Sequence, residues 1–194
     1  MTLRSHTTAS KPARGGFFRL GIAVVCLFLS ILPATYSRSQ PMEYLLKAGF
    51  LEKFARFTDW PEATDPARSD LPFTIAVIGE NPFEGSLETL YATEKIKNRP
   101  VKIKYISTPA DIDGSDILFI AGSEKNKLDA ILKATHGKSI LVVGDTTSFG
   151  ERGCHINFYI TPKGTVHFEI NLAKVKESGL HMQLVLLEIA KIIY

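Results

Sequence analysis

Hydrophobic and polar positions alternate in two segments between Cys154 and Asn171, in the sequence CHINFYITPKGTVHFEIN. Alternation with period two is typical of strands with one apolar and one polar face. Pro162, Lys163 and Gly164 suit a three-residue hairpin loop, because proline favours the start of a type I turn and glycine adopts the left-handed conformation. The predicted register pairs apolar residues with each other: Ile156 with Ile170, Phe158 with Phe168 and Ile160 with Val166.

The opposite face of this hairpin is polar and mixed in its chemistry. Two interpretations stay open at this point: a face in contact with water, or a contact surface for a partner protein. Asn171 suits the cap of a helix over 172–178, which Gly179 ends. The polar face carries His155, Asn157, Tyr159, His167, Glu169 and Asn171.

Three segments in the middle of the chain are apolar or nearly so, which predicts strands buried on both faces of a sheet. They are FTIAVI at 73–78, DILFIA at 116–121 and SILVV at 139–143. A further strand is predicted over 101–106, and helices are predicted over 83–91 and 124–136. Strands that alternate with helices favour an α/β fold with a mostly parallel sheet. We expect the C-terminal hairpin to add antiparallel strands at the edge of this sheet.

Both ends of the predicted domain are expected to be helices packed on the sheet. The first helix covers 42–59, and Pro61 ends it by pushing Trp60 out of the helical region. Trp60 is then a lid on the core or an exposed recognition residue. The last helix covers 182–193 and has few polar positions, so we expect it to be buried in the core or in part against a second subunit. In the first helix an apolar stripe faces inward and four charged residues lie away from it: Leu46, Phe50, Phe54 and Phe57 against Glu43, Lys47, Lys53 and Arg56.

Four residues at predicted strand ends form a candidate ligand site. Gly79, Glu80 and Asn81 follow the first buried strand, and Asp145 follows the third. Ligands of α/β folds bind at the carboxyl ends of strands, and the first amides of a helix attract anions. The alternatives are a structural turn at Gly79, since Glu80 repels phosphate, and a capping role for Asp145.

Residues 1–39 are predicted to be a cleaved secretory signal peptide, in which small residues follow an apolar run. The run from Leu20 to Leu32 has 13 residues, fewer than the roughly 20 that span a bilayer. This length favours a signal peptide over an uncleaved anchor. We expect export to a bacterial periplasm and a single domain over 40–194. The basic residues before the run are Arg4, Lys11, Arg14 and Arg19.

Removing the leader changes the charge of the chain. Five of the 23 basic and none of the 20 acidic residues precede Gln40, which leaves 18 against 20 and a formal net charge of −2. Nucleic-acid binding therefore lacks the basic patch that it needs. Cys154 is then the sole cysteine, which excludes an internal disulfide and favours a buried thiol. No metal site or cofactor is predicted, because the histidines at 136, 155, 167 and 181 lack ligand spacing.

Three functional classes are compared: a regulatory binding protein, a small-ligand-binding module and a hydrolase. The hydrolase would combine Ser123, Asp145 and a histidine in a triad. Ser123 lies in FIAGSEK, which lacks the second glycine of a GxSxG motif, and a triad is defined by geometry. We therefore predict that the protein is not an enzyme.

Several stretches occur in an order that resembles the YfiR-like family of exported proteins. They are KAGFLEKFARFTDWP, FTIAVIGENPF, DILFIA, ILVVGD, ERGCHINF and HFEINLAKVKESGL before an apolar final segment. The resemblance implies a Rossmann-like three-layer α/β domain that dimerises. It also implies a periplasmic regulator that binds the periplasmic part of an inner-membrane diguanylate cyclase and holds it inactive, which lowers cyclic di-GMP and biofilm formation. The periplasmic domain of a histidine kinase is the alternative partner.

The chain departs from this family pattern at Asp116, where a cysteine is often expected. Relatives with several cysteines can use disulfides for stability and redox sensing, and this part of the resemblance does not extend to a chain with Cys154 alone. The predicted partner contacts are Trp60 and the hairpin residues His155, Asn157, Tyr159, His167 and Glu169.

Overall fold

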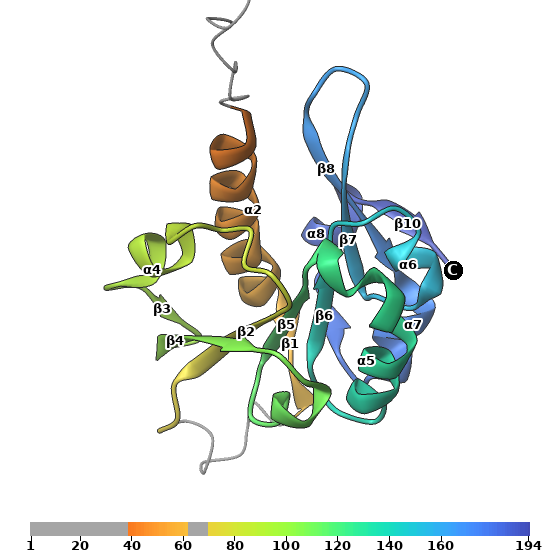
Figure 1. Cartoon of the computed structure of the whole chain (residues 1–194). Coiled ribbons are helices and arrows are strands. Elements are labelled where there is room, and N and C mark those ends of the chain that lie inside the picture. The colour runs from red at the N-terminus through yellow and green to blue at the C-terminus, as the bar shows by residue number, and fades with distance from the viewer. Residues whose placement is uncertain (1–38, 62–69) are drawn as a thin grey trace, which may run out of the picture. The chain divides into compact units, whose positions relative to one another are not determined.

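A computed structural model describes residues 39–61 and 70–194, which belong to one structural unit (Figure 1). The helices are α2 (Ser39–Arg56), α4 (Ser86–Tyr91), α5 (Leu128–Thr135), α6 (Phe149–Arg152), α7 (Leu172–Glu177) and α8 (Leu184–Glu188), with 3-10 helices η2 (Pro109–Asp111) and η3 (Gly122–Lys127). The strands are β1 (Thr58–Asp59), β2 (Phe73–Ile78), β3 (Lys95–Ile96), β4 (Arg99–Ile106), β5 (Ile117–Ile120), β6 (Leu141–Gly144), β7 (Ile156–Ile160), β8 (Val166–Asn171), β9 (His181–Met182) and β10 (Lys191–Ile193). The predicted signal peptide lies outside the described residues, apart from Ser39.

The main sheet has eight strands in the order β10-β8-β7-β6-β5-β2-β4-β3. Strands β4, β2, β5, β6 and β7 are parallel neighbours, and β8 pairs antiparallel with β7. Because β4 and β5 lie on opposite sides of β2, the strand order reverses between β2 and β5. The predicted α/β fold with a mostly parallel sheet and a C-terminal hairpin is confirmed.

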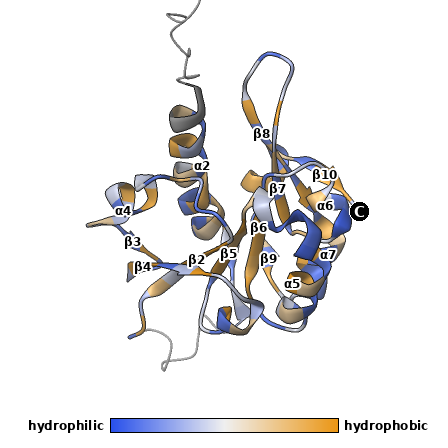
Figure 2. Ribbon diagram, viewed as in Figure 1, coloured by the Kyte–Doolittle hydropathy of each residue, from blue (hydrophilic) through white to orange (hydrophobic). Residues whose placement is uncertain are grey.

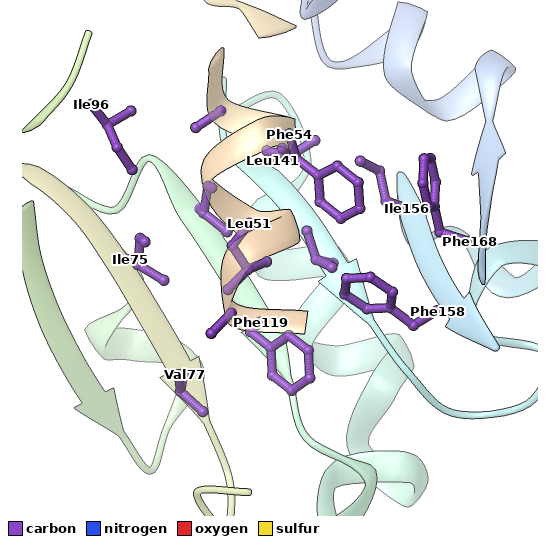
Figure 3. Close-up of a cluster of buried hydrophobic side chains, with 14 of the residues drawn as sticks. Leu51, Phe54, Ile75, Val77, Ile96, Phe119, Leu141, Ile156, Phe158 and Phe168 are labelled. Carbon is purple, nitrogen blue, oxygen red and sulfur yellow. The ribbon is translucent and has the colours of Figure 1, made fainter. Parts of the chain in front are cut away.

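The central strands are apolar on both faces, as their sequences predict (Figure 2). In β2, Ile75 and Val77 belong to a larger core cluster beneath α2, whereas Ala76 and Ile78 belong to a smaller cluster beneath α5. Figure 3 shows the larger cluster around Phe54, which is fully buried. Full burial of a side chain of this size contributes about 1.5–3 kcal/mol to stability. Helices therefore cover both faces of the sheet.

The hairpin β7–β8 has the predicted register. Ile156 pairs with Ile170, Phe158 with Phe168 and Ile160 with Val166. The N–H of Thr161 donates to the carbonyl of Thr165 at 3.0 Å, which closes the loop. Gly164 adopts a φ of +77°, the left-handed conformation that the turn requires.

Two glycines give a matched test of backbone conformation. Gly164→Ala is expected to lower the free energy of unfolding by about 1 kcal/mol, because alanine resists the left-handed region. Gly49 lies inside α2 with no atom within 4 Å of the Cβ position, so Gly49→Ala should raise stability by about 0.5–1 kcal/mol. Urea unfolding measures both changes, and a gain for Gly164→Ala would contradict the strained turn.

The inward face of α2 differs from the predicted stripe. Phe54 faces the core, but Leu46 is 48% exposed, and Lys47, predicted to lie away from the core, is only 3% exposed. The helix also ends at Arg56 rather than at Asp59, because Thr58 and Asp59 pair with β9. The buried apolar residues of this helix are Ala48, Leu51, Phe54 and Ala55.

The prediction of one buried helix over 182–193 is wrong. Met182 pairs with Thr58 in a two-stranded sheet, and β10 pairs in parallel with the end of β8. Only the five residues of α8 remain helical. Strand pairing with distant partners overrides the local helical pattern here, and it leaves several apolar side chains of this segment exposed.

Candidate functional site

The predicted ligand corner at Gly79 is a tightly packed turn. Gly79 has a φ of +99°, and a Cβ at this position would lie 2.5 Å from Oγ of Ser123. The Ser123 hydroxyl accepts a hydrogen bond from the N–H of Glu80 at 2.9 Å. Oδ1 of Asn81 accepts one from the N–H of Phe83 at 2.9 Å. The polar groups that a ligand would need are thus hydrogen-bonded within the turn. This agrees with the alternative that Gly79 lies in a structural turn rather than in a ligand site.

The same contacts bear on the proposed triad. Oγ of Ser123 is hydrogen-bonded to a backbone amide, and no histidine in the described part of the chain is hydrogen-bonded to it. Asp145 binds a lysine and a tyrosine rather than a histidine. The geometry that defines a triad is therefore not formed by these residues.

Asp145 lies in a buried charged cluster between α2 and the end of β6. Its Oδ2 accepts hydrogen bonds from Nζ of Lys47 at 2.7 Å and from the hydroxyl of Tyr44 at 2.8 Å. The side chains of Lys47 and Asp145 are only 3% and 5% exposed, and Lys47 also pairs with Glu43. The cluster links α2 to the sheet. Asp145 was predicted to cap a turn or to bind a ligand, and its observed contacts correspond to neither role.

Burial and the neighbouring carboxylate both act on Tyr44. Burial raises the pKa of its hydroxyl, and Asp145 raises this pKa further through its charge and its hydrogen bond. Tyr44 therefore stays protonated and donates to Asp145. The ammonium of Lys47 lies 4.2 Å from the centre of the Tyr44 ring, a favourable cation–π arrangement.

The polar face of the hairpin is mostly buried, so the interpretation of a face in contact with water is wrong for His155, Asn157 and Glu169. His155, Asn157, Glu169 and Asn171 are between 2% and 8% exposed. Asn171 caps α7 as predicted, because its Oδ1 accepts a hydrogen bond from the N–H of Lys174. At the far end of the hairpin His167 is exposed and Tyr159 is partly exposed.

The short helix α6 explains this burial. Phe149 of α6 is fully buried, and the carbonyl of Gly150 accepts a hydrogen bond from Nδ2 of Asn171 at 3.0 Å. Glu169 lies beside Gly150 and pairs with Nζ of Lys191 at 3.0 Å. The packing of α6 on the hairpin depends on Asn171 and Glu169, about 20 positions later, so the local sequence pattern does not indicate it.

Two further predicted positions are structural. Trp60 is 8% exposed and belongs to the larger core cluster, which supports the lid interpretation over a partner contact. Asp116 forms two hydrogen bonds of 3.0 Å with the guanidinium of Arg99 and accepts the N–H of Thr74 at 2.8 Å. Asp116 therefore anchors the start of β2 and β4 electrostatically.

Exposed apolar side chains gather on two helices that the sequence pattern predicted to be packed. We call Met42, Leu45 and Leu46 the α2 surface; they are 44–60% exposed. We call Leu184, Val185 and Ile189 the α8 surface; they are 47–68% exposed. The N–H of Gln183, just before α8, donates to the carbonyl of Phe57, just after α2, at 2.9 Å; this contact lies at the opposite end of α2 from the α2 surface.

The comparisons with known proteins give a family for this fold. A model of the YfiR/HmsC-like family matches residues 44–191, which is most of the chain. The chain belongs to the YfiR/HmsC-like family. A search of curated proteins finds no significant match. The family assignment confirms the resemblance that the sequence motifs indicate.

Two solved structures align with this YfiR/HmsC-like chain at low similarity. One is an ABC domain from Streptococcus pneumonia in complex with L-Trp, with 12% identity, a TM-score of 0.49 and coverage of 73% of this chain. The other is a conserved domain protein from Vibrio cholerae, with 15% identity, a TM-score of 0.46 and coverage of 69%. The chain spans 60% of each of these proteins.

YfiR/HmsC-like proteins are periplasmic regulators rather than enzymes, which makes regulation the functional class of this protein.

Within residues 39–61 and 70–194, no group of three or more histidine, cysteine or acidic residues is arranged to hold a metal ion. No helix of the described segments has the length and apolar character needed to cross a membrane. Cys154 is buried, as predicted, and burial raises the pKa of its thiol.

Proposed function

We propose that this protein is a periplasmic, non-enzymatic regulator that binds the periplasmic part of an inner-membrane signalling protein. The partner class is a diguanylate cyclase held inactive by the contact, which lowers cyclic di-GMP and biofilm formation; a histidine kinase is the other membrane partner. Family membership supports the regulatory class. Residues 1–39 act as the signal peptide, and residues 40–194 form the single exported domain.

The observation that carries this proposal is the pair of apolar surfaces on α2 and α8. Leu184 and Ile189 are 68% and 64% exposed, although both are large aliphatic residues. Clustered apolar residues on a surface mark protein–protein contacts, whereas isolated ones need no explanation. Phe50, one helical turn after Leu46, packs on Phe158 and Phe168 of the hairpin. The α2 surface therefore adjoins the apolar face of the hairpin. Tyr159, which is partly exposed, and His167, which is exposed, lie on the opposite face and form a separate proposed contact.

Acidic substitutions on the two surfaces test this contact. Leu45→Asp and Leu184→Asp should each weaken capture of the membrane partner by about tenfold or more, because central apolar contacts often contribute over 1.4 kcal/mol. Their effect on stability should stay within about 0.5 kcal/mol, as is usual for exposed positions. Pull-down from inner membranes measures capture, and intracellular cyclic di-GMP measures repression.

Leu71→Asp is the matched control. Leu71 is an apolar residue of similar exposure, 54%, before β2 and outside both surfaces. It should leave capture and cyclic di-GMP unchanged. If the three variants behave alike, or if no membrane signalling protein is recovered with the unaltered chain, the proposed partner contact is wrong.

A second copy of the chain is the other proposed partner, because the family resemblance implies dimers. Light scattering measures the oligomeric state of Leu45→Asp and Leu184→Asp, and so shows which of the two surfaces, if either, forms the dimer. Loss of a dimer with one variant and loss of membrane capture with the other would show that the two helices serve different partners. A monomer at all concentrations in the unaltered protein would remove the homodimer from the proposal.

A further inference from the structure

A cavity of about 500 Å³ lies at the amino ends of β6 and β7, at the opposite end of β6 from Asp145. Its lining comes from the last turns of α5 and α6, from α7, and from His155 just before β7. Small-molecule sites have volumes of about 300–1,000 Å³. The cavity is therefore large enough for a small metabolite, and it lies away from the strand ends where the sequence pattern placed a ligand.

His155 presents a fixed hydrogen-bond donor to this cavity. Nδ1 of the ring accepts a hydrogen bond from the N–H of Val142 at 3.0 Å. A neutral imidazole that accepts at Nδ1 carries its proton on Nε2. No described residue is hydrogen-bonded to Nε2, although the side chain is only 7% exposed and lines the cavity. The backbone thus holds an unused N–H donor at the wall of the cavity.

Positive charge is in excess around this donor. Lys133, Arg152 and Lys174 line the cavity, and Glu177 is the acidic residue among its lining. Nζ of Lys174 pairs with Glu177 at 2.7 Å, and Arg152 pairs with Asp129 at 2.8 Å. Lys133 makes no ion pair with a described residue. An N–H donor beside unbalanced positive charge suits the oxygens of an anion.

We propose that this cavity binds a small metabolite through a carboxylate or phosphate group. Nε2–H of His155 donates to one oxygen of the anion, and the ammonium group of Lys133, which makes no ion pair with a described residue, balances its charge. The site is independent of the proposed partner contact, because it uses neither the α2 surface nor the α8 surface. Binding can therefore be measured on the purified full-length protein without a partner.

The experiment follows the imidazole nitrogens by NMR while one of two probes is added at pH 7. Inorganic phosphate represents phosphate ligands, and succinate represents carboxylate ligands. The expected result is a saturable shift of the His155 Nε2 signal with one probe, while the signals of the exposed His167 and His181 stay unchanged. Lys133→Ala should weaken this binding by about tenfold, because it removes a charged partner.

Lys95→Ala is the matched control, since Lys95 is an exposed lysine of β3 outside the cavity. It should bind the probe as the unaltered protein does. The proposal is overturned if neither probe gives a saturable shift, if every histidine shifts together as in a general salt effect, or if Lys133→Ala and Lys95→Ala bind equally well.

Discussion

Asp145→Ala should lower the free energy of unfolding by about 3 kcal/mol. Breaking a buried ion pair from one side costs about 3–5 kcal/mol, because the remaining charge stays buried. Lys47, at 3% exposure, would lose its partner on the sheet, and Tyr44 would lose its acceptor. Glu43 still pairs with Lys47, which places the loss at the lower end of this range. Urea unfolding followed by circular dichroism measures the change.

Two comparisons isolate the buried pair. Asp113→Ala removes the exposed pair with Lys138 and should leave the unfolding midpoint unchanged. Lys47→Met combined with Asp145→Leu removes both charges and should recover most of the lost stability, because buried pairs are replaceable by apolar residues of similar volume. A loss below about 1 kcal/mol for Asp145→Ala alone would show that the pair does not hold α2 on the sheet.

Stability should also fall as the pH decreases from about 6.5 to about 4. Burial lowers the pKa of His155 from its usual 6.5 to about 4. In this window the unfolded chain binds a proton that the folded protein excludes, so acid favours unfolding. The contribution of the neutral His155 to stability is complete at pH values above the pKa of the unfolded chain. It is lost once the pH has fallen to the pKa of the folded protein. At 1.36 kcal/mol per unit, the total loss is about 3 kcal/mol.

His155→Asn provides the reference protein for this measurement. Asparagine offers an acceptor to the N–H of Val142 but does not titrate. The free energy of unfolding should be measured for both proteins between pH 4 and pH 7. Its dependence on pH should be steeper in the unaltered protein, by a difference that corresponds to the uptake of about one proton on unfolding. The surrounding titratable groups are common to both proteins. They are Lys133 and His136 at the end of α5, Arg152 on α6, and Lys174 and Glu177 on α7. Equal slopes would contradict a buried, neutral His155.

The central strands and the hairpin were predictable because their evidence is local. A run such as FTIAVI has no polar residue to expose except Thr74, so it fits only a strand covered on both faces. The register of β7 and β8 followed from the loop around Gly164 and from matching apolar residues. In both cases the deciding residues are close together in the sequence.

The parts that could not be predicted depend on residues far apart in the chain. Lys47 is buried because Asp145, 98 positions later, neutralises it. Glu169 and Asn171 are buried because α6 covers the hairpin face. The last segment is divided because Met182 pairs with Thr58 and β10 pairs with β8. The local sequence around a lysine or a helical segment does not indicate which distant residues or strands it will contact.

The cavity beside His155 was missed for a related reason. The alternating strands and helices of the sequence predict a ligand at the carboxyl ends of parallel strands, where most α/β folds bind them. The cavity instead opens at the amino ends of β6 and β7, between helices that end there. His155 itself was predicted as a partner contact and not as a ligand-binding residue, because the hydrogen bond to Val142 joins β6 to the residue before β7 and leaves no sign in the local sequence.

The buried cluster on α2 has a consequence for recognition. The same helix carries Lys47 on its inner side and Leu45 and Leu46 on its outer side, so the outer surface is held in place before any partner arrives. A preorganised surface loses little conformational entropy on association. Complexes built on such surfaces form with little backbone rearrangement. A partner should therefore meet α2 in the same backbone position in the free and the bound protein.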